Sequence, residues 1–315
     1  MNRQHVRAFV LTAFTAFLLF GPPALALEPQ KYVVRERGID LPVYVYLPDN
    51  VQGKVPAMLL VHGSGGLKLK AKEIYTRAFA RKGIATIFID SFTPRGVKST
   101  VEKQSSVDAI EMGRDAFAAL RYVGEHVKEI DAHNVGLMGF SKGGLVTLNV
   151  SLTVFNPNPN ALHFVRFIAM YPACESFRLN PKTIGPLTII AGADDGYNKP
   201  EYCEEMAKQL QQGGSPVTFH LIPGAQHAWD LPGPAKVVHK GENYSSCRFQ
   251  EIEPQVWIET HSKIKVFDHG KVPTRKQALD KCLTHTVSWG YSAKATGISM
   301  KYVEDEVESL NARHK

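Results

Sequence analysis

Residues 134–150 read NVGLMGFSKGGLVTLNV, which places Ser141 between glycines where two apolar runs meet. The run before the junction is typical of a buried strand, and the run after it is typical of a helix. This setting matches the G-x-S-x-G nucleophile elbow, in which small residues flank the serine because the turn is sharp. A turn residue or a helix cap is the alternative role for Ser141, so the rest of the sequence has to decide.

Short apolar runs recur on both sides of this junction. They are continuous rather than alternating, which is typical of strands buried on both faces of a parallel sheet. The runs are PAMLLVHG (56–63), ATIFID (85–90), FVRFIAMYP (164–172), LTIIAGA (187–193) and VTFHLIPG (217–224).

Helical patterns separate these runs, at residues 71–83, 106–127 and 200–214. In the second of them, four apolar residues are expected near one face: Ile110, Ala116, Leu120 and Val123. Residues 31–48 precede the first run and read as a strand pair. Strands that alternate with helices after a hairpin predict an α/β fold, with a mostly parallel, doubly wound sheet, in one domain over residues 27–315.

Residues 228–290 interrupt this alternation. The segment is polar, with strand-like stretches at 255–260 and 263–270, and it reads as an insertion. Residues 292–312 then read as a last helix. The sequence shows no internal repeat and no low-complexity segment.

Two further strand ends offer partners for a serine nucleophile, which needs a base held by a third group. The run at 187–193 is followed by Asp194 and Asp195, and the run at 217–224 is followed by His227. This order, serine then acid then histidine, is the order of an α/β-hydrolase triad. Open α/β sheets bind ligands at these strand ends, so we expect a triad of Ser141, Asp195 and His227, with Asp194 as a neighbour.

An oxyanion hole needs two backbone N–H groups. Lys142, directly after the serine, supplies one, and the glycine-rich segment HGSGG (62–66) supplies the other. Ser64 is the best donor in that segment, with Gly65 close behind. The segment does not fit a phosphate-binding loop, because the spacing is wrong and no Ser or Thr follows.

The first 26 residues have the three-part layout of a secretory signal: Arg3 and Arg7, an apolar stretch, and a small-residue cleavage site ending at Ala26. A retained membrane anchor is the alternative, but the apolar stretch is short for a span. Without Arg3 and Arg7, the formal charge is 35 − 30 = +5. The basic residues are scattered, which argues against nucleic-acid binding. We therefore expect a secreted or periplasmic protein without stable membrane insertion.

Four cysteines follow the signal: Cys174, Cys203, Cys247 and Cys282. An even number of cysteines in an exported protein favours disulfides, and four cysteines allow three pairings. We expect Cys174–Cys203 and Cys247–Cys282, because each pair falls within one segment of the chain. Free buried thiols are the alternative. No cysteine and histidine cluster has the spacing of a zinc site.

Five motifs together resemble the dienelactone hydrolase family of α/β-hydrolases: LLVHGSGG, DSFTPRGV, GLMGFSKGG, AGADDGYN and IPGAQHAWD. The resemblance covers roughly residues 30–230 and implies Ser141 as nucleophile, Asp195 as acid and His227 as base. The name-giving enzymes carry cysteine at the position of Ser141 and lack the export signal. Arg95, in the second motif, is expected either to orient an acidic substrate or to form a structural ion pair.

The leading interpretation is an exported serine hydrolase that cleaves small-molecule carboxylic esters or lactones through an acyl-enzyme. It requires no cofactor and no metal. A non-catalytic ligand-binding protein on the same scaffold is one alternative, although a chain without catalysis has no reason to keep all three triad members. Acyl transfer or peptidase activity by the same triad is another. Substrate identity and oligomeric state do not follow from the sequence.

Overall fold

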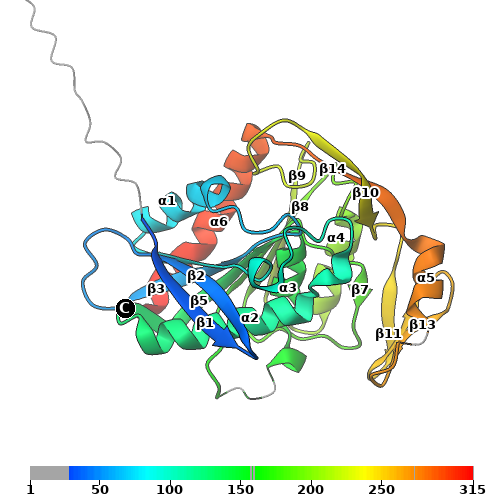
Figure 1. Ribbon diagram of the computed structural model, residues 1–315, viewed down its shortest axis with the longest axis horizontal. Coiled ribbons are helices and arrows are strands. Elements are labelled where there is room, and N and C mark those ends of the chain that lie inside the picture. Colours follow the sequence, from blue (N-terminus) through cyan, green and yellow to red (C-terminus); the bar gives the residue numbers. More distant parts are fainter. Residues whose placement is uncertain (1–27, 157, 159, 273, 315) are drawn as a thin grey trace, which may run out of the picture.

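The computed structural model describes residues 28–156, 158, 160–272 and 274–314 (Figure 1). The expected signal peptide, residues 1–26, lies outside the described residues. No helix in the described ranges combines the length and the apolar character that a membrane span requires.

An eight-stranded sheet forms the centre of the molecule, in the order β1-β2-β4-β3-β5-β6-β8-β9. Its strands are β1 (Gln30–Glu36), β2 (Ile39–Tyr46), β3 (Val55–Val61), β4 (Ala85–Ile89), β5 (Ile130–Phe140), β6 (Phe167–Met170), β8 (Leu187–Gly192) and β9 (Val217–Ile222). The β1–β2 and β2–β4 pairs are antiparallel and all other pairs are parallel. This arrangement confirms the predicted α/β-hydrolase fold with its N-terminal hairpin.

Helices cover both faces of the sheet (Figure 1). On one face lie α2 (Ala109–His126), α3 (Lys142–Ser151) and α4 (Pro200–Gln212), and on the other lie α1 (Glu73–Arg81) and α6 (Ala293–His314). Side chains along β3 alternate between the two layers: Leu59 packs with the first group, and Met58 and Leu60 pack with the second. Both layers are apolar, which explains the continuous apolar runs of the sequence.

Helix α2 corrects one detail of the sequence interpretation. Ala116, Leu120 and Val123 are buried as expected, but Ile110 is 47% exposed. Ala116 is six positions after Ile110, so the two residues lie about 120° apart around the helix. The helix begins where the Asp108 side chain accepts a hydrogen bond from the N–H of Glu111.

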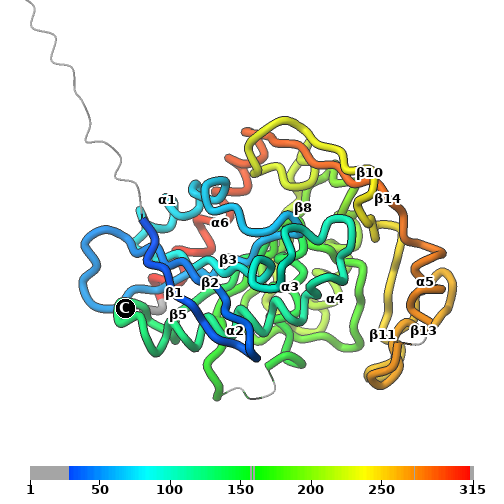
Figure 2. The backbone as a smooth tube through the Cα atoms, in the orientation of Figure 1, coloured from blue at the N-terminus to red at the C-terminus, as the bar shows by residue number. Residues whose placement is uncertain are grey.

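The chain leaves the main sheet after β9 and returns to it at α6 (Figure 2). In between, β10 (Lys236–Asn243) pairs with β14 (Thr284–Trp289). The strands β11 (Phe249–Glu253), β12 (Val256–Glu259) and β13 (Lys265–Asp268) form a second small sheet with β7 (Ser176–Phe177), and α5 (Arg275–Cys282) follows them. Four 3₁₀ turns complete the described elements: η1 (Lys70–Lys72), η2 (Thr93–Arg95), η3 (Gln104–Ser106) and η4 (Thr153–Phe155).

Both expected disulfides are present. The Cys174–Cys203 bond joins the segment after β6 to helix α4, and the Cys247–Cys282 bond joins the end of α5 to the segment after β10. The second bond lies next to the Asn243–Thr284 end of the β10–β14 pair, so it closes the part of the insertion beyond these two strands.

Candidate active site

The turn between β5 and α3 carries Ser141 in a backbone conformation that side chains rarely adopt, with φ 56° and ψ −114°. The neighbouring glycines make this turn possible. A Cβ on Gly139 would lie 1.9 Å from the carbonyl oxygen of Gly143, and a Cβ on Gly143 would lie 2.2 Å from that of Val61. Only glycine fits at either position, which is the reason for the spacing in GFSKGG.

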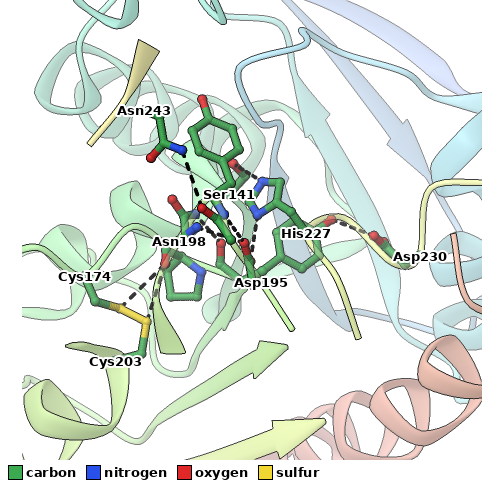
Figure 3. Close-up of polar contacts among 12 residues, drawn as sticks. Ser141, Cys174, Asp195, Asn198, Cys203, His227, Asp230 and Asn243 are labelled. Carbon is green, nitrogen blue, oxygen red and sulfur yellow. Dashed lines mark hydrogen bonds and ion pairs between the residues drawn. A yellow bond between two sulfur atoms is a disulfide. The ribbon is translucent and has the colours of Figure 1, made fainter. Parts of the chain in front are cut away.

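Ser141 and His227 meet beyond the carboxyl ends of their strands, and Asp195 contacts the other side of the His227 imidazole (Figure 3). The Ser141 Oγ lies 2.9 Å from the His227 Nε2, and the His227 Nδ1 lies 2.8 Å from the Asp195 Oδ2. The carboxylate accepts the Nδ1–H, so Nε2 is left to accept the serine proton. The structure therefore brings together the three residues expected to form the triad.

Backbone contacts fix Asp195 in this position. Its Oδ1 accepts hydrogen bonds from the N–H groups of Tyr197 (2.9 Å) and Asn198 (2.8 Å), which leaves Oδ2 for His227. Asp194, the other candidate acid, is exposed and its N–H donates to the carbonyl of Ala225 in the loop before His227. The acid loop and the histidine loop are thereby held together.

Aromatic rings enclose the imidazole of His227. The ring of Tyr171 stands edge-on to it at 5.0 Å between centroids, and the ring of Tyr197 lies at 4.7 Å. His227 is 4% exposed, so the hydrogen bonds to Ser141 and Asp195 form in a site with little water. Low local polarity strengthens both bonds.

The segment 62–66 packs directly against the elbow. A Cβ on Gly63 would lie 3.3 Å from the Cβ of Ser141. No acceptor in the described ranges takes the N–H of Ser64. The N–H groups of Ser64 and Lys142 thus come from the two segments that flank Ser141, as an oxyanion site requires, whereas Gly65 is exposed.

His62 joins this segment to the loop after β4. Its Nδ1 lies 2.9 Å from the carbonyl of Gly63, and its Nε2 accepts from the N–H of Ser91 at 3.3 Å. Burial lowers the pKa of His62, which favours the neutral ring that this pair of contacts needs. His62 orders two loops, and its ring has no hydrogen bond to a triad residue in the described structure.

The side chain of Lys142 turns away from the serine and is buried. Its Nζ donates to the carbonyl of Gln104 at 2.5 Å and lies 3.3 Å from the Thr100 Oγ1. Burial lowers the pKa of this amine to about 8, although the charges of Asp108 and Glu242 act in the opposite direction. Lys142 therefore connects the elbow to the segment 99–106.

A buried ionic cluster lies on the far side of Tyr171 from His227. The Asp230 carboxylate is fully buried and accepts from the Lys72 Nζ (2.5 Å), the Tyr75 hydroxyl (2.8 Å) and the Tyr171 hydroxyl (2.6 Å). Burial acts to raise the pKa of Asp230, but the Lys72 charge and the three hydrogen bonds outweigh it, so the pKa is lowered. Tyr171 links this cluster to the imidazole.

A cavity of about 100 Å³ opens at Ser141 and His227. Its lining is mostly apolar, and the residues come from the main sheet, the segment 99–106 and the insertion. Those that form its apolar walls include Leu60, Phe88, Val101, Phe140, Leu231 and Trp289. Trp289 lies on β14, so the insertion forms part of the cavity wall beside Ser141.

Arg95 lies outside this cavity. Its guanidinium forms a two-point ion pair with Asp115, at 2.8 and 2.9 Å, and also donates to the carbonyl of Ser91 at 2.7 Å. Of the two roles expected for Arg95, the structure places it in the structural ion pair.

Sequence analysis missed several residues around the site. Tyr171 and Gln104 lie in none of the five motifs, and Tyr197 was given no role although it lies in AGADDGYN. Asp230 could have been singled out from sequence, because it is the last residue of the motif IPGAQHAWD. Its partner Lys72 lies 158 positions away, and the sequence does not show that the two residues pair. In the described ranges, no three His, Cys, Asp or Glu side chains gather to form a metal site.

The chain is similar to known hydrolases. A family model described as the dienelactone hydrolase family matches residues 41–249. A solved structure assigned as a dienelactone hydrolase, from Klebsiella pneumoniae subsp. pneumoniae MGH 78578, is 19% identical with a TM-score of 0.53, and the match covers 65% of this chain and 88% of that one.

A thermophilic esterase from the planctomycete Thermogutta terrifontis is 17% identical with a TM-score of 0.53, over 65% of this chain and 85% of that one. At these identities the two structures show a shared fold. No curated protein matches the sequence.

Proposed function

Because this chain belongs to the dienelactone hydrolase family, and is thus a hydrolase of the esterase type, we propose that it cleaves carboxylic esters or lactones through Ser141, His227 and Asp195. The observation that carries the proposal is the pair of hydrogen bonds, 2.9 and 2.8 Å long, that joins these residues in the order serine, histidine, aspartate. Each side chain has the partner that its role requires.

In the reaction, the Ser141 Oγ attacks the carbonyl carbon while the His227 Nε2 takes the hydroxyl proton. Asp195 holds the imidazole in the required tautomer and stabilises its positive charge. The N–H groups of Ser64 and Lys142 donate to the oxyanion of the tetrahedral intermediate.

The intermediate collapses by breaking the bond from the carbonyl carbon to the alkoxy oxygen, and His227 gives its proton to the leaving oxygen. Water then attacks the acyl-enzyme, again with His227 as the base. A free carboxylic acid is released and the Ser141 hydroxyl is restored.

The cavity points to small substrates. Its volume of about 100 Å³ lies below the range of about 300–1,000 Å³ that holds drug-sized ligands. Because the lining is mostly apolar, we expect short acyl groups to bind beside Ser141 in preference to long chains.

Export is part of the proposal. It rests on the layout of residues 1–26 and on two disulfides, which persist in oxidising compartments such as the periplasm and the cell exterior. Detection of the protein in periplasmic or culture fractions, with Leu27 as its first residue, is the expected result.

Hydrolysis of a series of p-nitrophenyl esters tests the activity. We expect turnover of acetate and butyrate esters and a kcat/KM at least about 10-fold lower for decanoate, with no turnover by Ser141→Ala. A folded protein that hydrolyses no ester or lactone would contradict the proposal and favour a ligand-binding role.

A further inference from the structure

One short segment, residues 99–106, lies across the residues that flank Ser141. The N–H of Thr100 donates to the carbonyl of Ser64 at 2.8 Å, and the Ser99 hydroxyl donates to the same oxygen at 3.1 Å. Two hydrogen bonds therefore hold Ser64 from outside the segment 62–66. We call residues 99–106 the strap.

Gln104, like Thr100, contacts both Ser64 and Lys142, and it is the residue of the strap whose side chain bonds to both. Its side-chain Oε1 accepts from the Ser64 hydroxyl at 2.9 Å, and the Lys142 Nζ lies 3.4 Å from the same atom. Its main-chain carbonyl accepts from the Lys142 Nζ at 2.5 Å. One residue thus binds to the segments before and after the nucleophile.

The other end of the same amide reaches the acid loop. The Gln104 Nε2 donates to the Tyr197 hydroxyl at 2.8 Å. Tyr197 in turn donates its N–H to the Oδ1 of Asp195 and packs its ring beside His227. A displacement of Gln104 would therefore move Tyr197, which contacts both Asp195 and His227.

The strap is also joined to the insertion. The N–H of Gln104 donates to the Glu242 carboxylate at 2.7 Å, and the N–H of Glu242 donates to the carbonyl of Val101 at 2.9 Å. Glu242 lies on β10, which pairs with the strand that carries Trp289. Gln104 consequently binds to residues of four segments around the site: Ser64, Lys142, Tyr197 and Glu242.

Gln104 itself does not line the cavity and does not contact Ser141 or His227 in the described structure. Its amide has no acid–base chemistry at neutral pH. What it can supply is geometry, because oxyanion donors stabilise a transition state only when they are held in place before the reaction.

We propose that Gln104 is a positioning residue that fixes the Ser64 segment against the elbow and couples both to the acid loop and the insertion. The proposal rests on the function proposed above. It assigns to the strap a role in the chemical step, beyond its contribution to folding.

Gln104→Met tests the proposal, because methionine keeps the side-chain length and both main-chain contacts but removes the amide. We expect kcat for p-nitrophenyl acetate to fall about 10- to 100-fold, with KM changed less than about 3-fold, since donor placement matters most in the transition state. Gln104→Glu keeps an acceptor for Ser64 and Lys142, and its carboxylate can accept from the Tyr197 hydroxyl, which then donates instead of accepting. This variant should therefore recover most of the lost kcat.

Gln209→Met is the matched control. Gln209 lies on α4, is also half-buried, and donates one side-chain hydrogen bond to the carbonyl of Arg178. Neither residue belongs to the strap or to the segments that it contacts. Its kcat should equal that of the wild-type enzyme. An unchanged kcat in Gln104→Met, or an equal loss in both methionine variants, would overturn the proposal.

Hydrogen exchange supplies a readout that does not depend on turnover. In Gln104→Met, amides of residues 62–66 should exchange at least several-fold faster than in the wild-type protein. If the amides of residues 62–66 exchange at the same rate in Gln104→Met as in the wild-type protein, the proposal is overturned even where kcat falls. If the wild-type protein hydrolyses no ester, the proposed function fails, and the exchange rates still decide whether Gln104 holds the segment.

Discussion

At the scale of single residues, Asp230 shows how much a buried charge depends on its partners. It is fully buried beside Lys72, whose side chain is only 11% exposed, and the two tyrosine hydroxyls donate to the same carboxylate. Removal of one charge of such a pair leaves the other buried without compensation.

We therefore expect Asp230→Asn to lower the free energy of unfolding by about 3–5 kcal/mol, measured by urea denaturation. Asp280→Asn is the matched control, because Asp280 pairs with Lys276 on the surface, where the side chains are 58% and 89% exposed. Exposed pairs contribute little, so the control should change stability by less than about 0.5 kcal/mol. Equal losses in the two variants would contradict this account.

Glu175 provides a pH-dependent test. Burial raises the pKa of its carboxyl to about 8, the charge of Asp195 adds to the effect, and the Oε1 has no hydrogen-bond partner among the described residues. The folded protein thus keeps a proton that the unfolded chain releases above its ordinary pKa of 4.5. It follows that this group lowers the free energy of unfolding as pH rises from 4.5 towards 8.

Glu175→Gln removes this dependence. The variant should gain about 2–4 kcal/mol in unfolding free energy relative to the wild-type protein between pH 5 and pH 8. Denaturant titrations of both proteins at the two pH values measure the difference. A difference that is the same at pH 5 and pH 8 would show that Glu175 is ionised in the folded state.

At the scale of secondary-structure elements, the elbow depends on close packing of backbone against backbone. Gly143→Ala would place a Cβ 2.2 Å from the carbonyl oxygen of Val61, on β3. Because backbone cannot yield as a flexible side chain does, we expect the turn to shift and kcat to fall at least about 100-fold. The kcat of purified, folded variant measures this.

Gly297→Ala is the control for that substitution. Gly297 lies within α6, and a Cβ there meets no atom within 4 Å. Alanine in an exposed helix should stabilise the protein by about 0.5–1 kcal/mol and leave kcat unchanged. Wild-type kcat in Gly143→Ala would mean that the elbow tolerates a larger residue than its geometry suggests.

The elements of the main sheet could be predicted because their side chains are buried on both faces and read as continuous apolar runs. The expected triad residues followed from those runs, since each lies in the turn or loop that follows a strand. The strand β10, with the sequence KVVHKGEN, is mostly exposed and gives no such signal, and β7 is only two residues long.

Gln104 could not be identified from sequence for a different reason. Its partners Ser64, Lys142, Tyr197 and Glu242 lie in four segments that only the folded chain brings together. Ile110 was placed wrongly because an apolar residue near a helix end was assigned to a face that its angular position does not reach.

At the scale of the whole molecule, the disulfide Cys247–Cys282 closes a segment of the insertion and lies next to the paired strands β10 and β14. A bond with a sequence separation of 35 residues restricts the unfolded chain and stabilises the fold by about 2–4 kcal/mol. Since Trp289 on β14 lines the cavity, loosening of the insertion should also weaken substrate binding.

The double variant Cys247→Ser/Cys282→Ser should therefore show a lower melting temperature and a KM raised about 3- to 10-fold, with kcat changed less than KM. Cys174→Ser/Cys203→Ser is the comparison, because that bond ties α4 behind the acid loop and no atom of it lines the cavity. It should lower the melting temperature with a smaller effect on KM. The reverse order of the KM effects would contradict the role given to the insertion.

The central claim is that Ser141 is an activated nucleophile, and intact-mass analysis after treatment with a fluorophosphonate tests it most directly. We predict one adduct per wild-type chain, located on Ser141 by peptide mapping, and no adduct on Ser141→Ala or His227→Ala. A folded wild-type protein that remains unlabelled, or an adduct that persists in Ser141→Ala, would contradict the account.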